Sequence, residues 1–202
     1  MKLYTIGHGT VNVSDFIATI RKYDINAIVD VRSIPYSKYV NAYNRENIEY
    51  TLKENKISYI YMGDLLGARY NNSVFFNEDR RVIFKKVQKT ANFNKGIERI
   101  INGINKGFTI SLMCSEEDAF VCHRFGLISE YIRDKVNIIH IGTSYERINA
   151  ELEQRLISTY DSEIDQIRFY TENPLNLTMH DYKLNEAYKF HNLKIGYVSG
   201  EN

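Results

Sequence analysis

The chain has 202 residues, of which 44% are hydrophobic and 25% charged, a composition typical of one globular domain with a proper core. Its 26 basic and 25 acidic residues give a formal net charge of +1, which excludes a global electrostatic attraction to nucleic acid or to an anionic membrane. The two cysteines favour a reducing, cytoplasmic location, the N-terminus MKLYTIGHGT lacks an apolar leader, and no apolar run is long enough to cross a membrane.

The first half of the chain alternates between strand-like and helix-like patterns. We expect strands at 2–6, 25–31 and 57–61, a helix that begins after Asn12, and a second helix over 46–55. The run INAIVDV is nearly continuous in apolar residues, as in strands that are buried on both faces. Residues 33–45 and 70–80 are expected to be irregular, since Pro35 and Asn71-Asn72 favour turns.

The second half continues the alternation. Two helical patterns precede an expected strand at 108–113, and the second of them ends at Gly103 or Gly107. Three further elements are then expected, a helix over about 119–134, a strand at 136–141 and a helix at 146–157. In the remaining segment we expect a strand at 167–170, an interruption at Pro174 and a helix at 179–191.

This order predicts an α/β fold with a mostly parallel, open sheet of about five strands and helices on both faces. We expect a single domain, in which residues 1–158 form the α/β domain and residues 159–202 form a C-terminal extension packed on it.

Polar residues recur where the expected strands end, and the carboxyl ends of parallel strands share one edge of a sheet, where ligands bind. These residues are Gly7-His8-Gly9, Asp30 and Arg32, Gly63-Asp64, Cys114 and His140. Structural interpretations remain open, since Asp30 and Arg32 suit an ion pair and Cys114 suits a small buried side chain. For His140, which interrupts an apolar strand, we favour a core position.

The chemistry expected at this edge is acid–base or thiol chemistry on an anion. His8, Asp30, Cys114 and Glu116 are the candidate catalytic residues. Arg32, Arg69, His123 and Arg124 are candidates for binding the ligand.

On the expected helix 119–134, with about 100° per residue, Val121 and Arg124 fall within one apolar stripe. Cys122 and His123 fall on its flanks or outside it. A buried arginine needs a partner, either Glu116 or Asp118 or a bound anion.

Several reaction classes fit this stretch poorly. A phosphatase or rhodanese loop needs a short spacing from cysteine to arginine, whereas Arg124 follows Cys114 by ten residues, and the acidic residues between them oppose a thiolate. Zinc binding by Cys114, Cys122 and His123 is a weaker alternative, because seven residues separate the cysteines where two to four are usual. A redox disulfide between the two cysteines has no local support, and no phosphate-binding glycine loop is present.

Four motifs in series resemble the "domain of unknown function 488" family: TIGHGT, DVRSIPYSKY followed by AYN, YMGDLLGAR, and LMCSEEDAFVCHR followed by HI. The resemblance implies a small cytoplasmic α/β domain, and it supplies no reaction. It adds Ser37, Asn44 and Gly67 to the candidate ligand-binding residues, together with Gly7. The chain departs from the pattern at Tyr43, where the family usually has phenylalanine, at Ala68, where it has glycine, and in lacking a proline between the cysteines.

We therefore expect an enzyme, a hydrolase or transferase, that acts on an anionic small molecule or on a substrate derived from a nucleotide or nucleic acid. No cofactor is predicted apart from the zinc alternative. A second hypothesis is a nucleotide or nucleic-acid binding module without catalysis, in which tyrosines stack on bases beside basic side chains. The residues in question are Tyr36, Tyr39 and Tyr43, with Lys38 and Arg45.

Overall fold

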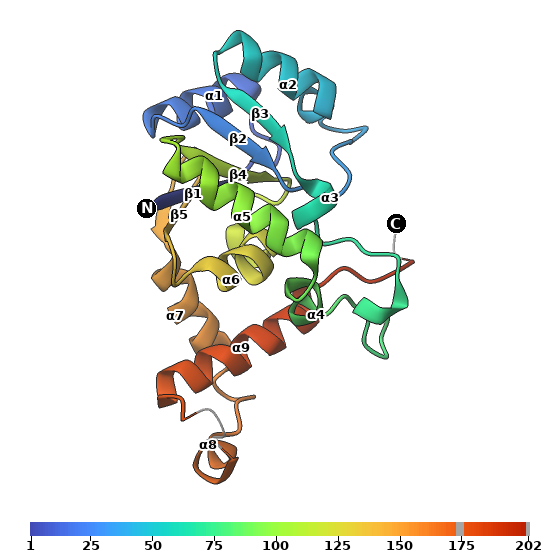
Figure 1. The fold of residues 1–202 in the computed structure, drawn as a ribbon, viewed down its shortest axis with the longest axis vertical. Coiled ribbons are helices and arrows are strands. Elements are labelled where there is room, and N and C mark those ends of the chain that lie inside the picture. Colours follow the sequence, from blue (N-terminus) through green and yellow to red (C-terminus); the bar gives the residue numbers. More distant parts are fainter. Residues whose placement is uncertain (173–175, 201–202) are drawn as a thin grey trace.

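The computed structural model describes residues 1–172 and 176–200, and it is built on a six-stranded sheet (Figure 1). The strands are β1 (Lys2–Gly7), β2 (Ala27–Asp30), β3 (Ser58–Tyr61), β4 (Ile110–Cys114), β5 (Asn137–Ile141) and β6 (Glu146–Ile148). They lie in the order β3-β2-β4-β1-β5-β6, and only the pairing of β6 with β5 is antiparallel. The expected α/β fold with a mostly parallel sheet is confirmed, with one strand more than expected.

Helices connect these strands. They are α1 (Val13–Lys22), α2 (Arg45–Glu54), α3 (Gly63–Leu66), α4 (Phe84–Gln88), α5 (Ala91–Asn105), α6 (Glu130–Ile132), α7 (Asn149–Tyr160), α8 (Gln166–Glu172) and α9 (Met179–Ile195). Short 3₁₀ turns lie at Asn41–Tyr43, Ser73–Phe75 and Ala119–Val121, and a π-helix spans Arg124–Ser129. Among the described residues, no helix is both long and apolar enough to span a membrane.

The sheet has a separate apolar layer on each face, because successive side chains of a strand point to opposite sides. In β2, Ile28 packs with residues of α1 and α2, whereas Ala27 and Val29 pack with residues of α5. All three are buried, which explains why this run is apolar without alternation. Helices therefore cover both faces, as expected.

A third apolar cluster joins Phe120 and Phe125 to Leu156 of α7 and to Leu184 and Tyr188 of α9. Figure 1 shows α7, α9 and α8 extending away from the sheet on the side opposite α1 and α2. After α9 the chain returns toward the sheet, where the Val82 N–H donates to the Tyr197 carbonyl at 2.9 Å. Tyr197 of this segment lies near the end of β4, because it lines the same pocket as Cys114.

Three expectations about single elements are wrong. Residues 167–170 belong to helix α8, not to a strand, because Asp165 accepts from the Arg168 N–H at its start and Arg168 forms an i,i+4 ion pair with Glu172. Residues 146–148 form strand β6 before α7 begins. The expected interruption at Pro174 lies outside the described residues.

The third correction concerns the expected helix over 119–134. Cys122 has extended backbone angles, φ −120° and ψ 146°, and it separates a 3₁₀ turn from the π-helix. The segment is therefore three short helical pieces with one break, and the break lies at the cysteine.

Candidate functional site

The candidate site lies where β1 and β4 end side by side in the sheet. From these neighbouring strands the chain departs in opposite directions, from β1 toward β2 and from β4 toward β5. Such a switch point opens a crevice at the carboxyl ends of the strands. The His8 N–H donates to the Cys114 carbonyl at 3.0 Å, and the Gly9 N–H donates to the Ser115 carbonyl at 2.9 Å, so the pairing continues beyond the strands.

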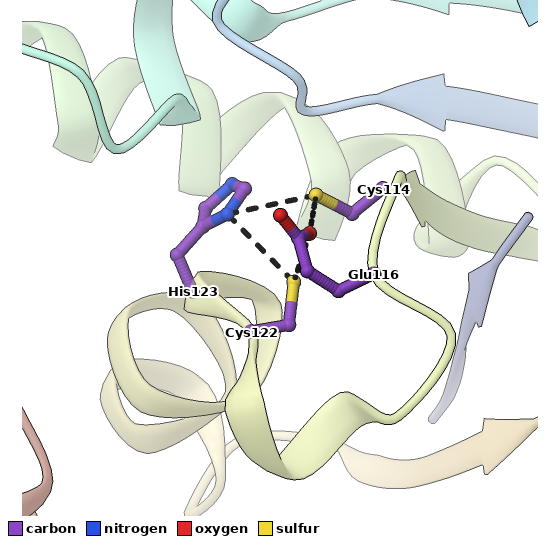
Figure 2. A group of neighbouring side chains, drawn as sticks. All are labelled: Cys114, Glu116, Cys122 and His123. Carbon is purple, nitrogen blue, oxygen red and sulfur yellow. Dashed lines mark hydrogen bonds between the residues drawn. The ribbon is translucent and has the colours of Figure 1, made fainter. Parts of the chain in front are cut away.

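Four side chains converge just beyond the end of β4 (Figure 2). The Cys114 Sγ–H donates to Glu116 Oε2 at 2.8 Å, and the Cys122 Sγ–H donates to the same oxygen at 3.2 Å. His123 Nδ1 lies 3.6 Å from Cys114 Sγ and 3.8 Å from Cys122 Sγ. One donor atom from each residue lies within 4.8 Å of the others, and these four residues, which we call the Cys–Glu–Cys–His cluster, could hold a metal ion.

The local chain geometry explains how the cluster forms. Cys114 is the last residue of buried β4, and Cys122 occupies the extended break before the π-helix. Gly7 lets the loop between them approach β1, because a Cβ at this position would lie 1.8 Å from the Glu116 carbonyl oxygen. Gly7 therefore has a steric role that only glycine can fill.

The His123 ring is held in one orientation. Its Nε2 lies 3.1 Å from the Val31 carbonyl oxygen, which can only accept, so Nε2 carries the hydrogen. In a neutral imidazole the lone pair is then on Nδ1, the atom that faces both sulfurs.

The acidic and thiol groups of the cluster lie in a partly desolvated environment. Glu116 is exposed as a residue, yet its carboxylate turns inward to both thiols (Figure 2), and burial of that group raises its pKa. Burial likewise raises the pKa of the Cys114 thiol. For Cys122 burial acts in the same direction, but its interaction with Cys114 and the charge of Arg124 together bring its pKa well below the usual value.

Arg124 is fully buried behind the cluster, which agrees with its place in the expected apolar stripe. Its guanidinium donates to the backbone carbonyls of Glu116 and Glu117, the latter at 2.7 Å, and its Nε has no hydrogen-bond partner. Of the expected alternatives, Glu116 is a partner through its backbone carbonyl and not its carboxylate, whereas Asp118 pairs with Arg155 instead. Cys122 is also buried, at 1% exposure, and does not lie on an outer flank.

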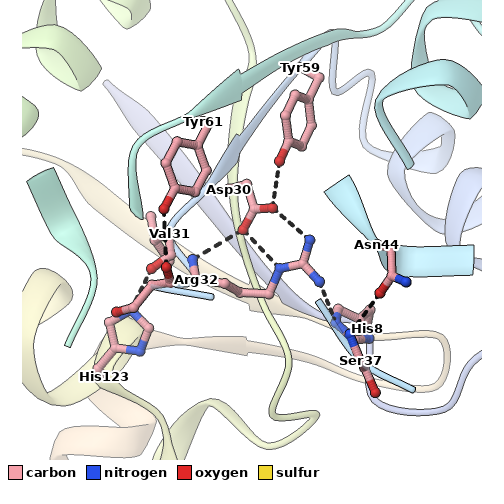
Figure 3. A network of polar contacts seen from close by, with 10 residues as sticks. His8, Asp30, Val31, Arg32, Ser37, Asn44, Tyr59, Tyr61 and His123 are labelled. Carbon is pink, nitrogen blue, oxygen red and sulfur yellow. Dashed lines mark hydrogen bonds and ion pairs between the residues drawn. The ribbon is translucent and has the colours of Figure 1, made fainter. Parts of the chain in front are cut away.

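A second polar network lies on the β2 side of the cluster (Figure 3). Asp30 and Arg32 form a buried ion pair, with Arg32 Nε 2.9 Å from Asp30 Oδ1 and Nη2 2.6 Å from Oδ2. Tyr59 also donates to Asp30, at 2.7 Å.

His8 completes this network. Its Nδ1 donates to the Gly9 carbonyl, so its Nε2 accepts from Arg32 at 3.1 Å, and burial lowers the pKa of His8 to about 4. The ring stacks on Tyr43, with 4.1 Å between centroids.

A pocket of about 200 Å³ joins the two networks. Its wall contains reactive groups and cations from distant parts of the chain, and it is lined by Arg32, Ser33, Ile34, Ala68, Arg69, Cys114, Ser115, Glu116, Val121, His123, Ile195 and Tyr197. Of the candidate residues, Arg32, Arg69, Cys114, Glu116 and His123 meet in this pocket. His8, Asp30 and Arg124 lie behind its wall.

The remaining candidates do not line the pocket. The Ser37 N–H donates to Asn44 Oδ1 at 2.7 Å, which fixes the loop between β2 and α2. A Cβ on Gly67 would lie 2.3 Å from Ser33 Oγ. His140 is a core residue, because its two ring nitrogens are bonded to Thr5 and Asn149.

Sequence reasoning missed two contributions to this region. The zinc alternative omitted Glu116, although its position two residues after Cys114 places it on the same loop. Ile195 and Tyr197 come from the C-terminal segment, in which no local pattern indicated a site. Tyr197 lies under Arg69, whose guanidinium carbon is 5.1 Å from the ring centroid.

The fold and the pocket together define an α/β protein with a polar pocket at a topological switch point. The chain belongs to the family described as "Domain of unknown function DUF488", whose model matches residues 12–132 and therefore includes the whole Cys–Glu–Cys–His cluster. The resemblance inferred from the motifs is confirmed. No curated protein and no solved structure matches the chain.

Proposed function

We propose that the pocket at the β1–β4 switch point is the active site of an enzyme, a hydrolase or transferase, that acts on an anionic small molecule or on a nucleotide or nucleic-acid-derived substrate. One observation carries the proposal: a thiol, a carboxylate and an imidazole share a single pocket with two arginines. Acid–base or nucleophilic groups beside fixed cations suit reactions at phosphate or carboxylate groups.

The two arginines suit different tasks. Arg32 is buried and held by Asp30 and His8, so its position is fixed before a ligand arrives. Arg69 is exposed at the rim, and among the described residues it has no carboxylate within 4 Å. Arg69 is therefore available to bind an incoming anion.

The alternative pocket between α4, the π-helix and α9 supports an active site less well. It has a volume of about 230 Å³, but its lining contains no thiol and no imidazole. Its carboxylate, Glu130, forms an ion pair with Lys85.

The cellular location that we propose for the protein is the cytoplasm. Both cysteines have free thiols, and a reducing compartment keeps thiols in that state.

Binding of inorganic phosphate and of AMP, measured by calorimetry at low salt, tests the anion site. Arg69→Ala should weaken binding by roughly 10- to 100-fold, the effect of one charge-assisted hydrogen bond. Arg21→Ala is the matched control, since Arg21 lies on α1 and contacts Asn55. If neither anion binds the wild-type protein, or if both variants weaken binding equally, the proposal is wrong.

Turnover is tested separately. The protein is incubated with a mixture of phosphorylated and carboxylated metabolites, and mass spectrometry identifies the compounds consumed. Cys114→Ala and Glu116→Gln should abolish that consumption without changing the fold. Consumption at the wild-type rate by both variants would place the chemistry elsewhere.

A nucleic-acid binding module is the second candidate, because Tyr36 and Tyr39 are 64% and 95% exposed. Tyr43 does not fit this role, since it is buried against His8 and Phe16. In fluorescence polarisation with a single-stranded oligonucleotide, Tyr36→Ala and Tyr39→Ala should each weaken binding by roughly 5- to 100-fold. Tyr50→Ala, at a similarly exposed tyrosine on α2, should not. An absence of binding at low salt rejects the module.

A further inference from the structure

We propose that Cys114, Glu116, Cys122 and His123 together bind one zinc-class divalent ion, and that Glu116 is the exchangeable ligand on the side of the pocket. The first part, the metal site, stands on the cluster alone. The second part rests on the function proposed above, because it places the ion beside the anionic substrate.

The donor set suits zinc, and so does the spacing between His123 and the two sulfurs. Glu116 Oε2, at 2.8 and 3.2 Å from the sulfurs, lies closer than in a zinc site and has to move outward when the ion binds. Two thiolates, an imidazole and a carboxylate are all common zinc ligands, and the soft sulfur donors select against magnesium and calcium. With Zn–S near 2.3 Å and Zn–N near 2.0–2.1 Å, a tetrahedral site separates sulfur from nitrogen by about 3.6 Å. The distances from His123 Nδ1 to the two sulfurs, 3.6 and 3.8 Å, are close to this value.

The surroundings of the ligands are those of a metal site. The bond from His123 Nε2 to the Val31 carbonyl fixes the ring and directs the Nδ1 lone pair at the sulfurs. Such an outer hydrogen bond accompanies nearly every histidine that binds a metal. The Arg124 backbone N–H also donates to Cys122 Sγ at 3.5 Å, which favours the thiolate form.

Charge balance supplies an independent argument. Arg124 is fully buried, and among the described residues no carboxylate lies within ion-pair distance of it. A buried cation of this kind needs a compensating negative charge nearby. Two thiolates and one carboxylate around a divalent ion leave one net negative charge, which Arg124 balances. The Arg124 guanidinium donates to the Glu116 carbonyl, so its charge lies beside the loop that carries one of the ligands.

The position of each ligand relative to the pocket defines its role. Cys114, Glu116 and His123 line the pocket, whereas Cys122 lies behind them. Glu116 is the only one of the four from an exposed residue, and it comes from a loop between secondary-structure elements. Catalytic zinc sites keep three protein ligands and one exchangeable position. Displacement of Glu116 would open that position to an anionic oxygen.

Formation of the site needs no redox partner. Any protons on the two sulfurs, on Glu116 and on His123 Nδ1 pass to solvent when the ion binds, and no electron is transferred. A bound zinc ion would supply a Lewis acid that polarises a substrate oxygen or a water molecule.

Metal analysis of the full-length purified protein tests the first part. We expect about one zinc ion per chain, as for a single tetrahedral site. Glu116→Gln and His123→Asn should each weaken zinc binding at least roughly tenfold, since even outer-shell changes have such effects. The matched controls are Glu117→Gln and His180→Asn, at exposed residues outside the cluster, and they should retain full occupancy.

A second measurement on the wild-type protein covers variants that fail to fold. A chelator should remove the ion and lower the melting temperature, and zinc should restore it. Cobalt(II) in place of zinc should give the absorption bands of a tetrahedral thiolate site. A folded wild-type protein that takes up neither zinc nor cobalt, or whose cysteines form a disulfide when purified under reducing conditions, overturns the proposal.

Two further variants separate this proposal from the proposed function. Cys122→Ser should lose zinc, although Cys122 does not line the pocket, whereas Arg69→Ala should keep zinc and bind phosphate more weakly. If zinc binds and phosphate does not, the metal site stands and the anion site fails. If phosphate binds and zinc does not, the metal proposal fails alone.

Discussion

Two guanidinium groups are buried at the pocket, and their charges are compensated differently: Arg32 lines the pocket, whereas Arg124 lies behind its wall. Arg32 is paired through two nitrogens with Asp30, which Tyr59 also contacts. A bidentate pair of this kind offsets much of the cost of removing both charges from water. Arg124 has backbone carbonyls as hydrogen-bond acceptors, so its compensation depends on the charges of the cluster. The Asp30–Arg32 pair is thus the simpler one to test.

Asp30→Asn should lower the free energy of unfolding by roughly 3–5 kcal/mol, because it leaves the Arg32 charge buried and unpaired. The measurement is urea unfolding followed by circular dichroism. Asp161→Asn is the control, since it removes an exposed ion pair with Lys183 and should change stability by about 0–1 kcal/mol. Equal effects of the two substitutions would show that Asp30 does not compensate Arg32.

At the scale of elements, the loop from Ser115 to Asp118 is held against β1. Gly7 gives it room, and the Arg124 guanidinium binds two of its carbonyls. The Tyr145 hydroxyl donates to the Glu117 carbonyl as well, at 2.7 Å. The position of Glu116 in the cluster therefore depends on contacts made by the loop backbone.

Gly7→Ala should displace this loop, because the added Cβ would overlap the Glu116 carbonyl oxygen. We expect a loss of about 3 kcal/mol in unfolding free energy, the upper range for overpacking, and zinc binding weakened more than roughly tenfold. Denaturant unfolding and zinc titration measure the two effects. Gly103→Ala is the control, because the tip of the flexible Ile110 side chain can move away from its Cβ. Wild-type zinc affinity in Gly7→Ala would refute the steric role.

The regular elements could be predicted from sequence where one hydrophobic period extends over a whole element. Strands β1, β4 and β5 and helix α5 are of this kind, since each has a continuous buried face. The segment 119–134 could not be predicted in this way. A helical wheel assumes the same angle per residue throughout one helix, whereas this segment changes from 3₁₀ to π geometry. Val121, which the wheel places inside, is 51% exposed.

At the scale of the whole molecule, several histidines are buried in neutral form. Burial lowers the pKa values of His8 and His140 to about 4 each, and it also lowers that of His191. An unfolded chain binds protons at histidine near pH 6.5. At these histidines, between about pH 6.5 and 4, the unfolded state therefore binds more protons than the folded state, so their contribution lowers the stability as the pH falls.

On going from pH 7 to pH 5, each histidine with a pKa near 4 should lower the free energy of unfolding by on the order of 2 kcal/mol. Urea unfolding at the two pH values measures the loss. His140→Gln should reduce the pH dependence, whereas His180→Gln, at an exposed position, should leave it unchanged. Stability that is equal at pH 7 and pH 5 would contradict the prediction.

The candidate site was only partly predictable because it depends on contacts between distant segments. The rule that parallel strands end at one edge brought Arg32 and Cys114 together, and both line the pocket. The same rule placed His8 at this edge, but His8 lies behind Arg32 and does not line the pocket. The sequence could not show this, because no local pattern tells which residue at a strand end faces the pocket and which lies behind it. The contribution of Tyr197 depends on the return of the chain after α9, which no local pattern encodes.

The Cys–Glu–Cys–His cluster should be a metal site in the wall of an anion-binding pocket. Crystals of the purified protein soaked in phosphate, with diffraction recorded on both sides of the zinc absorption edge, test it most directly. We predict one anomalous peak bonded to Cys114, Cys122 and His123, with Glu116 or a phosphate oxygen as the fourth ligand. A bond between the two sulfurs, or no peak between these residues, would contradict the account.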